Sequence, residues 1–300
     1  QEASRKLGYS PSRTMQIAQK LYEGVAVDGQ TLGLITHMRT DSTNLSGLSI
    51  SAISNYVTKV FGANYSKVRQ FKTKNSSAQE AHEAIRPTNV SSLENGEDSA
   101  QQKLYSLIWN RTVASQMSSA KVETTQIDIT NSKNIEIFTA KGEILVFDGF
   151  YKVYGGGKDD QLLPDLQQGD ELTYELITAT QSFSKPSARF TEASLVRTLE
   201  ELGIGRPSTY APTISTIQAR GYVERSDVEV PEKQIEVIEL KNDDIIEKQE
   251  TDKSKIDKNK LLPTHLATVT TDFLVKQFDN IVSKFKDIEN NLNNQTDLNT

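Results

Sequence analysis

The sequence contains no cysteine, and its 300 residues include only three histidines. The absence of cysteine excludes disulfide bonds, a cysteine nucleophile and any zinc or iron–sulfur site built on thiolates. The histidines are scattered at His37, His82 and His265, so we expect no metal ligands in this chain. No apolar run approaches the ~20 residues of a membrane-spanning helix, and no signal peptide opens the sequence. We therefore expect a soluble cytoplasmic protein that has no membrane partner.

Positive charge is also scarce, because the formal net charge is −6. Compact nucleic-acid-binding domains are usually basic, but a net charge describes a whole chain and not one of its faces. Residues 185–225 contain six Lys/Arg against four Glu, whereas residues 226–260 contain seven Lys against eleven Asp/Glu. A mildly basic block thus precedes an acidic one, and the overall sign does not exclude nucleic acid as a partner.

The spacing of apolar residues changes twice along the chain. Residues 1–119 show mostly helical spacing, residues 120–184 alternate with a period of two, and helical spacing returns from residue 185. We therefore predict a multidomain α and β protein: a helical domain at 1–119, a β domain at 120–184, and a helical domain at 185–300. The last includes short strands and a charged, acidic loop at 226–260, and a polar tail. Because the chain starts without methionine and ends in a polar, asparagine-rich stretch, we expect a fragment of a larger protein.

A first candidate site is the polar run Thr36-His37-Met38-Arg39-Thr40-Asp41-Ser42. We predict a strand over residues 32–37, and the end of a strand holds side chains rigidly enough for chemistry. Arg39 could bind a phosphate through two hydrogen bonds. The same residues also fit a simple turn in which Asp41 or Ser42 caps the next helix and Arg39 is solvated.

A second candidate is the run Gln79-Glu80-Ala81-His82-Glu83-Ala84-Ile85-Arg86-Pro87-Thr88. An imidazole flanked by carboxylates could shuttle a proton or donate a hydrogen bond to a phosphate. The second histidine of a zinc protease motif is absent. A solvated turn in which His82 satisfies the local backbone remains the alternative.

A third candidate is the turn Gly203-Ile204-Gly205-Arg206-Pro207-Ser208-Thr209-Tyr210, which lies between two predicted helices. Glycines let the backbone approach a ligand closely, and the amides at a helix N-terminus attract anions. Arg206, Ser208 and Thr209 would add a guanidinium and two hydroxyls to such a phosphate cradle, with Ser208 or Thr209 capping the second helix. Helix, turn and helix also outline a helix-turn-helix DNA reader, or an ordinary corner between two helices.

The three runs, in this order, resemble the motifs of type IA DNA topoisomerases of the bacterial topoisomerase I kind. The resemblance covers roughly residues 1–290 and is weakest at 226–260. It implies the central region of such an enzyme: a helical domain that bears the nucleophile, part of a β arch, and a helix-turn-helix-like domain that grips DNA. It also implies the family's ATP-independent activity, in which one strand is cut through a 5′-phosphotyrosine, another strand passes, and negative supercoils relax.

The resemblance implies roles for individual residues. His37 occupies the position of the tyrosine nucleophile, Arg39 stabilises the scissile phosphate, and His82 contacts phosphate beside the cleavage site. Three further residues would grip the backbone of single-stranded DNA: Arg206, Ser208 and Thr209.

Two departures from the family pattern limit this activity. The nucleophilic tyrosine is replaced by His37, and the acidic Toprim domain that would carry Mg²⁺ should precede residue 1. We therefore predict a chain of the bacterial nucleoid that binds single-stranded DNA, takes no small-molecule substrate and does not cleave. The alternatives are a non-enzymatic helix-turn-helix protein that reads DNA with residues 191–220, or an interaction scaffold that binds no nucleic acid.

Overall fold

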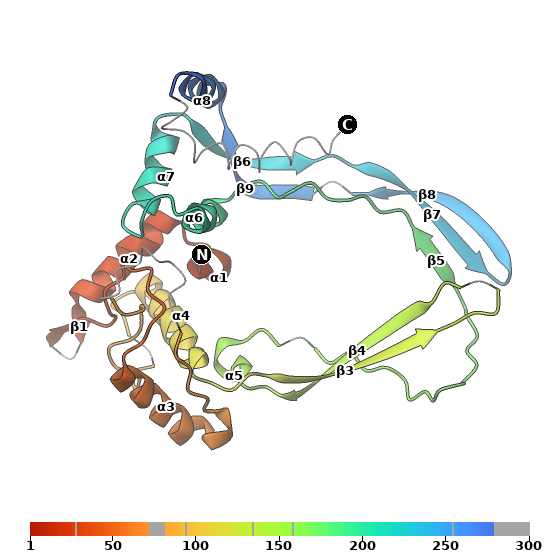
Figure 1. Ribbon diagram of the computed structural model, residues 1–300, viewed down its shortest axis with the longest axis horizontal. Helices are drawn as coiled ribbons and strands as arrows, with labels where there is room; N and C mark the ends of the chain where they lie inside the picture. The colour runs from red at the N-terminus through yellow and green to blue at the C-terminus, as the bar shows by residue number, and fades with distance from the viewer. Residues whose placement is uncertain are drawn as a thin grey trace. The chain divides into compact units, whose positions relative to one another are not determined.

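The computed structural model describes residues 1–27, 29–71, 82–93, 95–133, 135–157, 159–253 and 255–278. These residues form two compact units (Figure 1). The N-terminal unit comprises Glu2–Gln168 with Arg206–Ser208, and the C-terminal unit comprises Gly169–Gly205 and the residues from Thr209 onward, with Gln1. The predicted polar tail lies outside the described residues. No helix in the described part of the chain is long and apolar enough to cross a membrane.

Helices dominate the first part of the N-terminal unit: α1 (Glu2–Leu7), α2 (Pro11–Glu23), α3 (Gly47–Phe61), the short 3₁₀ helix η1 (Ala63–Tyr65) and α4 (Ser99–Ser115). The start of α2 is set by Ser10, whose hydroxyl accepts a hydrogen bond from the amide of Arg13, and by proline in the first turn. The helix ends at Gly24, whose φ of 123° suits glycine best.

The core of this unit is built around α4. Tyr105, Trp109 and Val113 on α4 are at most 4% exposed, and they belong to one buried cluster with Leu21 from α2 and Val57 from α3. Each such side chain contributes roughly 1.5–3 kcal/mol when it leaves water. The core therefore holds together segments that are distant in the sequence.

The strands of this unit form two separate hairpins: β1 (Val25–Val27) with β2 (Gln30–Leu32), and β3 (Lys121–Ile129) with β4 (Phe138–Phe147). A short helix, α5 (Tyr151–Tyr154), follows β4. The β3–β4 ladder confirms the period-two prediction for this stretch. We predicted a separate β domain at 120–184. In the structure, its residues up to Gln168 belong to the compact N-terminal unit.

The predicted strand over residues 32–37 is wrong, because β2 ends at Leu32. Beyond it the chain runs against the end of α2: the amide of Leu34 donates to the carbonyl of Leu21 at 2.7 Å. A Cβ atom at Gly33 would lie only 2.8 Å from the carbonyl oxygen of Tyr22. Residue 35 then forms a single β-bridge with Pro87. The backbone in front of His37 is thus held by a helix end and a distant loop, which apolar spacing alone does not reveal.

The described part of the C-terminal unit contains three helices and two sheets. The helices are α6 (Glu192–Glu201), α7 (Tyr210–Ala219) and α8 (His265–Gln277). One sheet has the order β5 (Ile177–Thr180), β7 (Lys233–Lys241), β8 (Asp244–Asp252), and the other pairs β6 (Val223–Val230) with β9 (Lys255–Pro263). Because β5 pairs with β7, one sheet crosses the predicted domain boundary at 184/185. The three-domain division itself stays a prediction.

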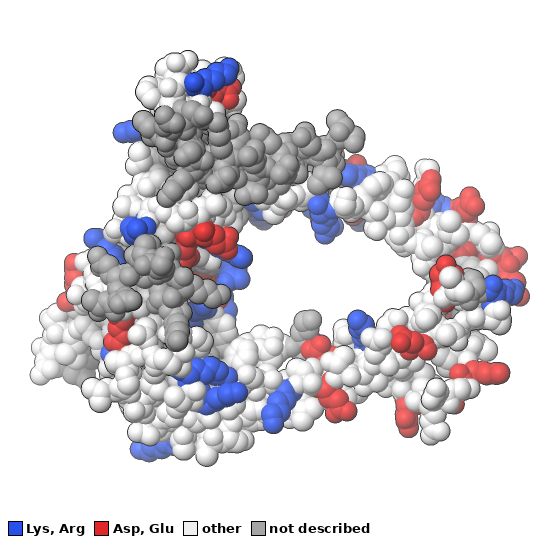
Figure 2. Space-filling model, viewed as in Figure 1, with Lys and Arg blue, Asp and Glu red and all other residues white. Residues whose placement is uncertain are grey.

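The short strands predicted within 226–260 are confirmed, whereas the charged, acidic loop predicted there is wrong, because most of this segment forms regular antiparallel strands. All nine residues of β8 are exposed, and Figure 2 shows acidic side chains over the far end of the β7–β8 hairpin. A two-stranded ribbon that is exposed to solvent on both faces needs no apolar alternation, since backbone hydrogen bonds hold it together.

Candidate functional site

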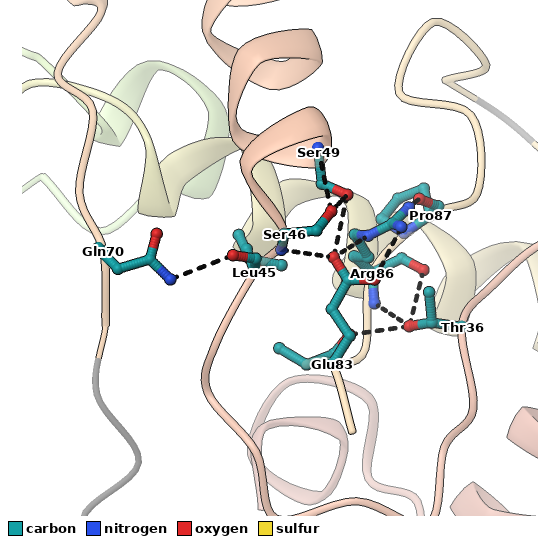
Figure 3. Close-up of polar contacts among 9 residues, drawn as sticks. Thr36, Leu45, Ser46, Ser49, Gln70, Glu83, Arg86 and Pro87 are labelled. Carbon is teal, nitrogen blue, oxygen red and sulfur yellow. Dashed lines mark hydrogen bonds and ion pairs between the residues drawn. The ribbon is translucent and has the colours of Figure 1, made fainter. Parts of the chain in front are cut away.

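The site begins where residues 34–36 lie alongside residues 84–88 (Figure 3). The amide of Thr36 donates to the carbonyl of Arg86 at 2.9 Å, and the amide of Arg86 donates back to the Thr36 hydroxyl oxygen at 3.0 Å. The Thr36 hydroxyl also donates to the carbonyl of Ala84 at 2.8 Å, and the amide of Thr88 donates to the carbonyl of Leu34 at 3.0 Å. The first two candidate motifs are thereby joined into one element.

Glu83 is the polar centre of this junction. One carboxylate oxygen accepts from the amide of Ser46 at 2.9 Å and from the Ser49 hydroxyl at 3.0 Å. The Arg86 guanidinium donates to both oxygens, each at 2.9 Å. Ser46 is the N-cap of α3, so Glu83 ties the loop that carries His82 to the start of that helix. Burial raises the pKa of Glu83, but these hydrogen bonds outweigh burial and lower its pKa to about 2.

Three aromatic rings meet directly beside this network. The ring centres of His37 and His82 are 5.5 Å apart with an angle of 56° between their planes, and the ring centres of Tyr22 and His37 are 5.2 Å apart in a T-shaped arrangement. His37 follows Thr36 in the chain and His82 precedes Glu83, so the junction positions both backbones. Both histidines are half-buried. The structure therefore brings together two predicted site residues that are 45 positions apart in sequence.

Arg39, the third predicted residue of this region, is exposed. The alternative in which Asp41 or Ser42 caps the next helix is wrong, because Ser46 holds that position. The Ser46 hydroxyl accepts from the amide of Ser49 at 3.2 Å. A turn therefore separates Arg39 from the helix, and its guanidinium is accessible to a ligand.

The turn between α6 and α7 carries the other predicted residues. Arg206, Ser208 and Thr209 are all exposed. Gly205 has a φ of 80°, and a Cβ atom there would lie 3.1 Å from the Tyr210 ring, so this position needs glycine. Thr209 is the N-cap of α7, as one of our two options predicted, but its side chain makes no cap hydrogen bond. Its ψ of −17° is already helical, whereas a capping side chain needs an extended backbone.

Several residues that build the site were not singled out by sequence reasoning, chiefly Tyr22, Ser46 and Ser49. Glu83 and Arg86 both lie in the second candidate run, but the rule that opposite charges three apart meet on a helix does not apply to them, because residues 83–86 are not helical. The partners on α3 had no signal in the sequence, because nothing local connects them to residue 83. Among the described residues, no group of three or more His, Asp or Glu side chains lies where it could hold a metal ion.

Comparison with known proteins decides the family. A family model described as DNA topoisomerase matches residues 1–255. This chain belongs to the DNA topoisomerase family. The resemblance of its three motifs to bacterial topoisomerase I, a type IA enzyme, is thereby confirmed at the level of the family, and a non-enzymatic helix-turn-helix protein is not favoured.

Individual relatives agree with this assignment. The chain is 40% identical over 300 residues to DNA topoisomerase 1 of Campylobacter jejuni, covering 97% of this topoisomerase chain and 38% of that relative. It is 46% identical over 235 residues to DNA topoisomerase 1 of Rickettsia conorii, covering 74% and 30%. The solved structure of full-length topoisomerase I from Thermotoga maritima matches with a TM-score of 0.72 and 33% identity, covering 97% and 44%. The chain thus spans well under half of the length of each.

Proposed function

We propose that this chain supplies the nucleophile-bearing and DNA-gripping parts of a type IA topoisomerase, that it binds single-stranded DNA, and that it does not cleave it. The observation that carries the proposal is the contact between residue 37 and His82, whose ring centres are 5.5 Å apart. It supports a shared phosphate position, with the exposed Arg39 two residues away in the chain. Cations fixed beside a phosphate stabilise the charge that develops during its transfer.

The expected defect comes from the chemistry of residue 37. A phenol that attacks phosphorus forms an ester that the freed hydroxyl can reverse. The reacting nitrogen of His37 would lie elsewhere than a tyrosine oxygen, and a misplacement of about 1 Å can cost ~10²-fold in rate. We therefore expect no covalent adduct from this chain and no relaxation of supercoiled DNA.

Among the described residues, we propose no binding site for the magnesium ion of the family. Glu83, the carboxylate nearest in sequence to His82, is already engaged by Arg86, Ser46 and Ser49. We propose that Mg²⁺ is held by an acidic domain of the larger protein, and that the assembled protein works on DNA in the bacterial nucleoid. Arg206, Ser208 and Thr209, all exposed, would grip the DNA backbone.

The test supplies a tyrosine at residue 37 and the acidic domain separately. His37→Tyr is made in this chain and in a longer chain that includes the acidic domain, and each is incubated with labelled single-stranded DNA and Mg²⁺. On a denaturing gel, adduct is expected only from the longer tyrosine form, whereas His265→Tyr in the longer chain, the matched control, should form none. Adduct from the unaltered chain would overturn the assignment of residue 37. Absence of adduct from the longer tyrosine form would overturn the placement of Arg39 and His82.

A further inference from the structure

Two of the three histidines in this chain lie against each other although 44 residues separate them in sequence. Both are half-buried, and the Tyr22 ring lies against His37 in a T-shaped arrangement, with 5.2 Å between the ring centres. Both backbones are held by the junction of Thr36, Glu83 and Arg86. The two imidazoles lie close enough for one small ligand to reach both rings.

We propose that His37 and His82 together bind a divalent transition-metal ion, such as Zn²⁺, Ni²⁺ or Cu²⁺, between their rings. The ring separation fits a shared ion. Adding the ~1.1 Å from a ring centre to its nitrogen to a Zn–N bond of ~2.0–2.1 Å puts each centre about 3.2 Å from the ion. Two such arms at a tetrahedral angle of about 109° separate the centres by about 5.2 Å, close to the 5.5 Å between the two rings. The angle of 56° between the planes is accommodated because each ring can turn about its own metal–nitrogen bond.

The surroundings select the kind of metal. Imidazole nitrogen suits zinc, copper and nickel, whereas magnesium and calcium prefer oxygen. The neighbouring carboxylate of Glu83 is turned to Arg86, Ser46 and Ser49, so it does not add a hard ligand. Half-burial of the histidines leaves room for water at the remaining coordination positions.

This site departs from our expectation that the chain has no metal ligands. The spacing from residue 37 to residue 82 matches no metal-binding motif, so only the folded chain places the two rings together. The inference rests on the positions of these rings alone, and it stands or falls separately from the proposed function.

Calorimetric titration of the intact chain with ZnCl₂ tests the site. We expect one ion per chain in the wild type. Loss of an outer-shell partner alone costs roughly 10–100-fold in metal affinity, so His37→Asn or His82→Asn should each weaken binding by at least about tenfold. His265→Asn is the matched control, since His265 is exposed on α8 of the other unit, and it should leave the affinity unchanged.

A second measurement keeps the proposal testable if a variant folds poorly. Electron paramagnetic resonance of the wild-type chain with one equivalent of Cu²⁺ should show hyperfine coupling to two equivalent imidazole nitrogens, and His37→Tyr, which keeps a ring beside Tyr22, should reduce this to one. Equal zinc affinity for wild type and His82→Asn, or a copper signal that depends on His265, would overturn the proposal.

Discussion

At the scale of single residues, Glu83 holds more of the site together than either histidine. Its carboxylate receives hydrogen bonds from Arg86, Ser46 and Ser49, and its side chain is 24% exposed. Hydrogen bonds to a charged group are stronger than neutral ones, and removal of one partner leaves the others unsatisfied. Glu83 thus acts on His82 through the backbone and does not need to touch a ligand.

Glu83→Gln should lower the free energy of unfolding of the N-terminal unit by roughly 1–3 kcal/mol at pH 7, the cost of losing a charged hydrogen-bond partner. The folded pKa of Glu83 is about 2, below its ordinary value of 4.5. Its contribution is therefore fully present above pH 4.5 and is lost as the pH falls towards 2.

Urea denaturation between pH 7 and pH 3 measures this difference. The gap between wild type and Glu83→Gln should shrink as the pH falls. Glu123→Gln, an exposed position on β3, should change stability little at any pH. A gap that stays constant down to pH 3 would contradict the assigned role of the carboxylate charge.

Among the three residues proposed to grip DNA, we expect Arg206 to contribute most to the binding affinity. Arg206→Ala should weaken binding of a single-stranded oligonucleotide by roughly 1–3 kcal/mol, and wild-type binding should weaken as salt rises because phosphate contacts release counterions. Fluorescence anisotropy titrations at two salt concentrations measure both effects, with Arg225→Ala on β6 as the control. Equal affinity of wild type and Arg206→Ala, or a preference for duplex, would refute this role.

At the scale of elements, helices and ribbons in this chain are held by different forces. α4 buries Leu104, Tyr105, Trp109 and Val113, so opening it exposes a hydrophobic core. β8 buries none of its residues, and β7 buries only Val237. The ribbons are therefore stabilised mainly by their hydrogen-bond ladders.

Hydrogen exchange should reflect this contrast. Amides of α4 should open with a free energy near that of global unfolding, whereas those of β8 should open locally and exchange much faster. Amides of β7, which pairs with β5 on one side and β8 on the other, should fall between them. Mass spectrometry of peptides after timed exchange measures all three elements in one sample, and equal protection of α4 and β8 would contradict this account.

At the scale of the whole molecule, the two units differ in the size of their cores. The N-terminal unit holds a large buried cluster. Among the described residues of the C-terminal unit, the buried apolar side chains are Ala211, Ile214, Val237 and Leu261. Burial of apolar area is the main source of stability, so the two units should not unfold as one.

The single tryptophan, Trp109, lies in the larger core and reports on that unit alone. In a urea titration, the far-ultraviolet circular dichroism should begin to fall before the Trp109 fluorescence changes. Ile214→Ala, which removes a side chain that is 2% exposed, should move the first transition to lower urea and leave the fluorescence midpoint unchanged. Coincident transitions would show that the units unfold together.

The amino-acid sequence by itself determined most of the helices and the family. The helical spacing around Ser10 and Thr191 and the caps at those residues are local features, and hydrogen bonds within one turn need no distant partner. The order of the three motifs was likewise readable without a fold, and the family comparison agrees with it.

Only the tertiary structure decided the features that depend on distant segments. The strands within 226–260 pair with partners that only the fold brings alongside, such as β5 with β7, and every residue of β8 is exposed, so no buried face marks β8 in the sequence. The meeting of His37 with His82 depends on a junction between residues 34–36 and 84–88. The hydrogen bonds of Glu83 reach back to the start of α3. The contacts of His37, His82 and Glu83 form when the core of the N-terminal unit closes, because burial of α4 and its neighbours brings those segments together.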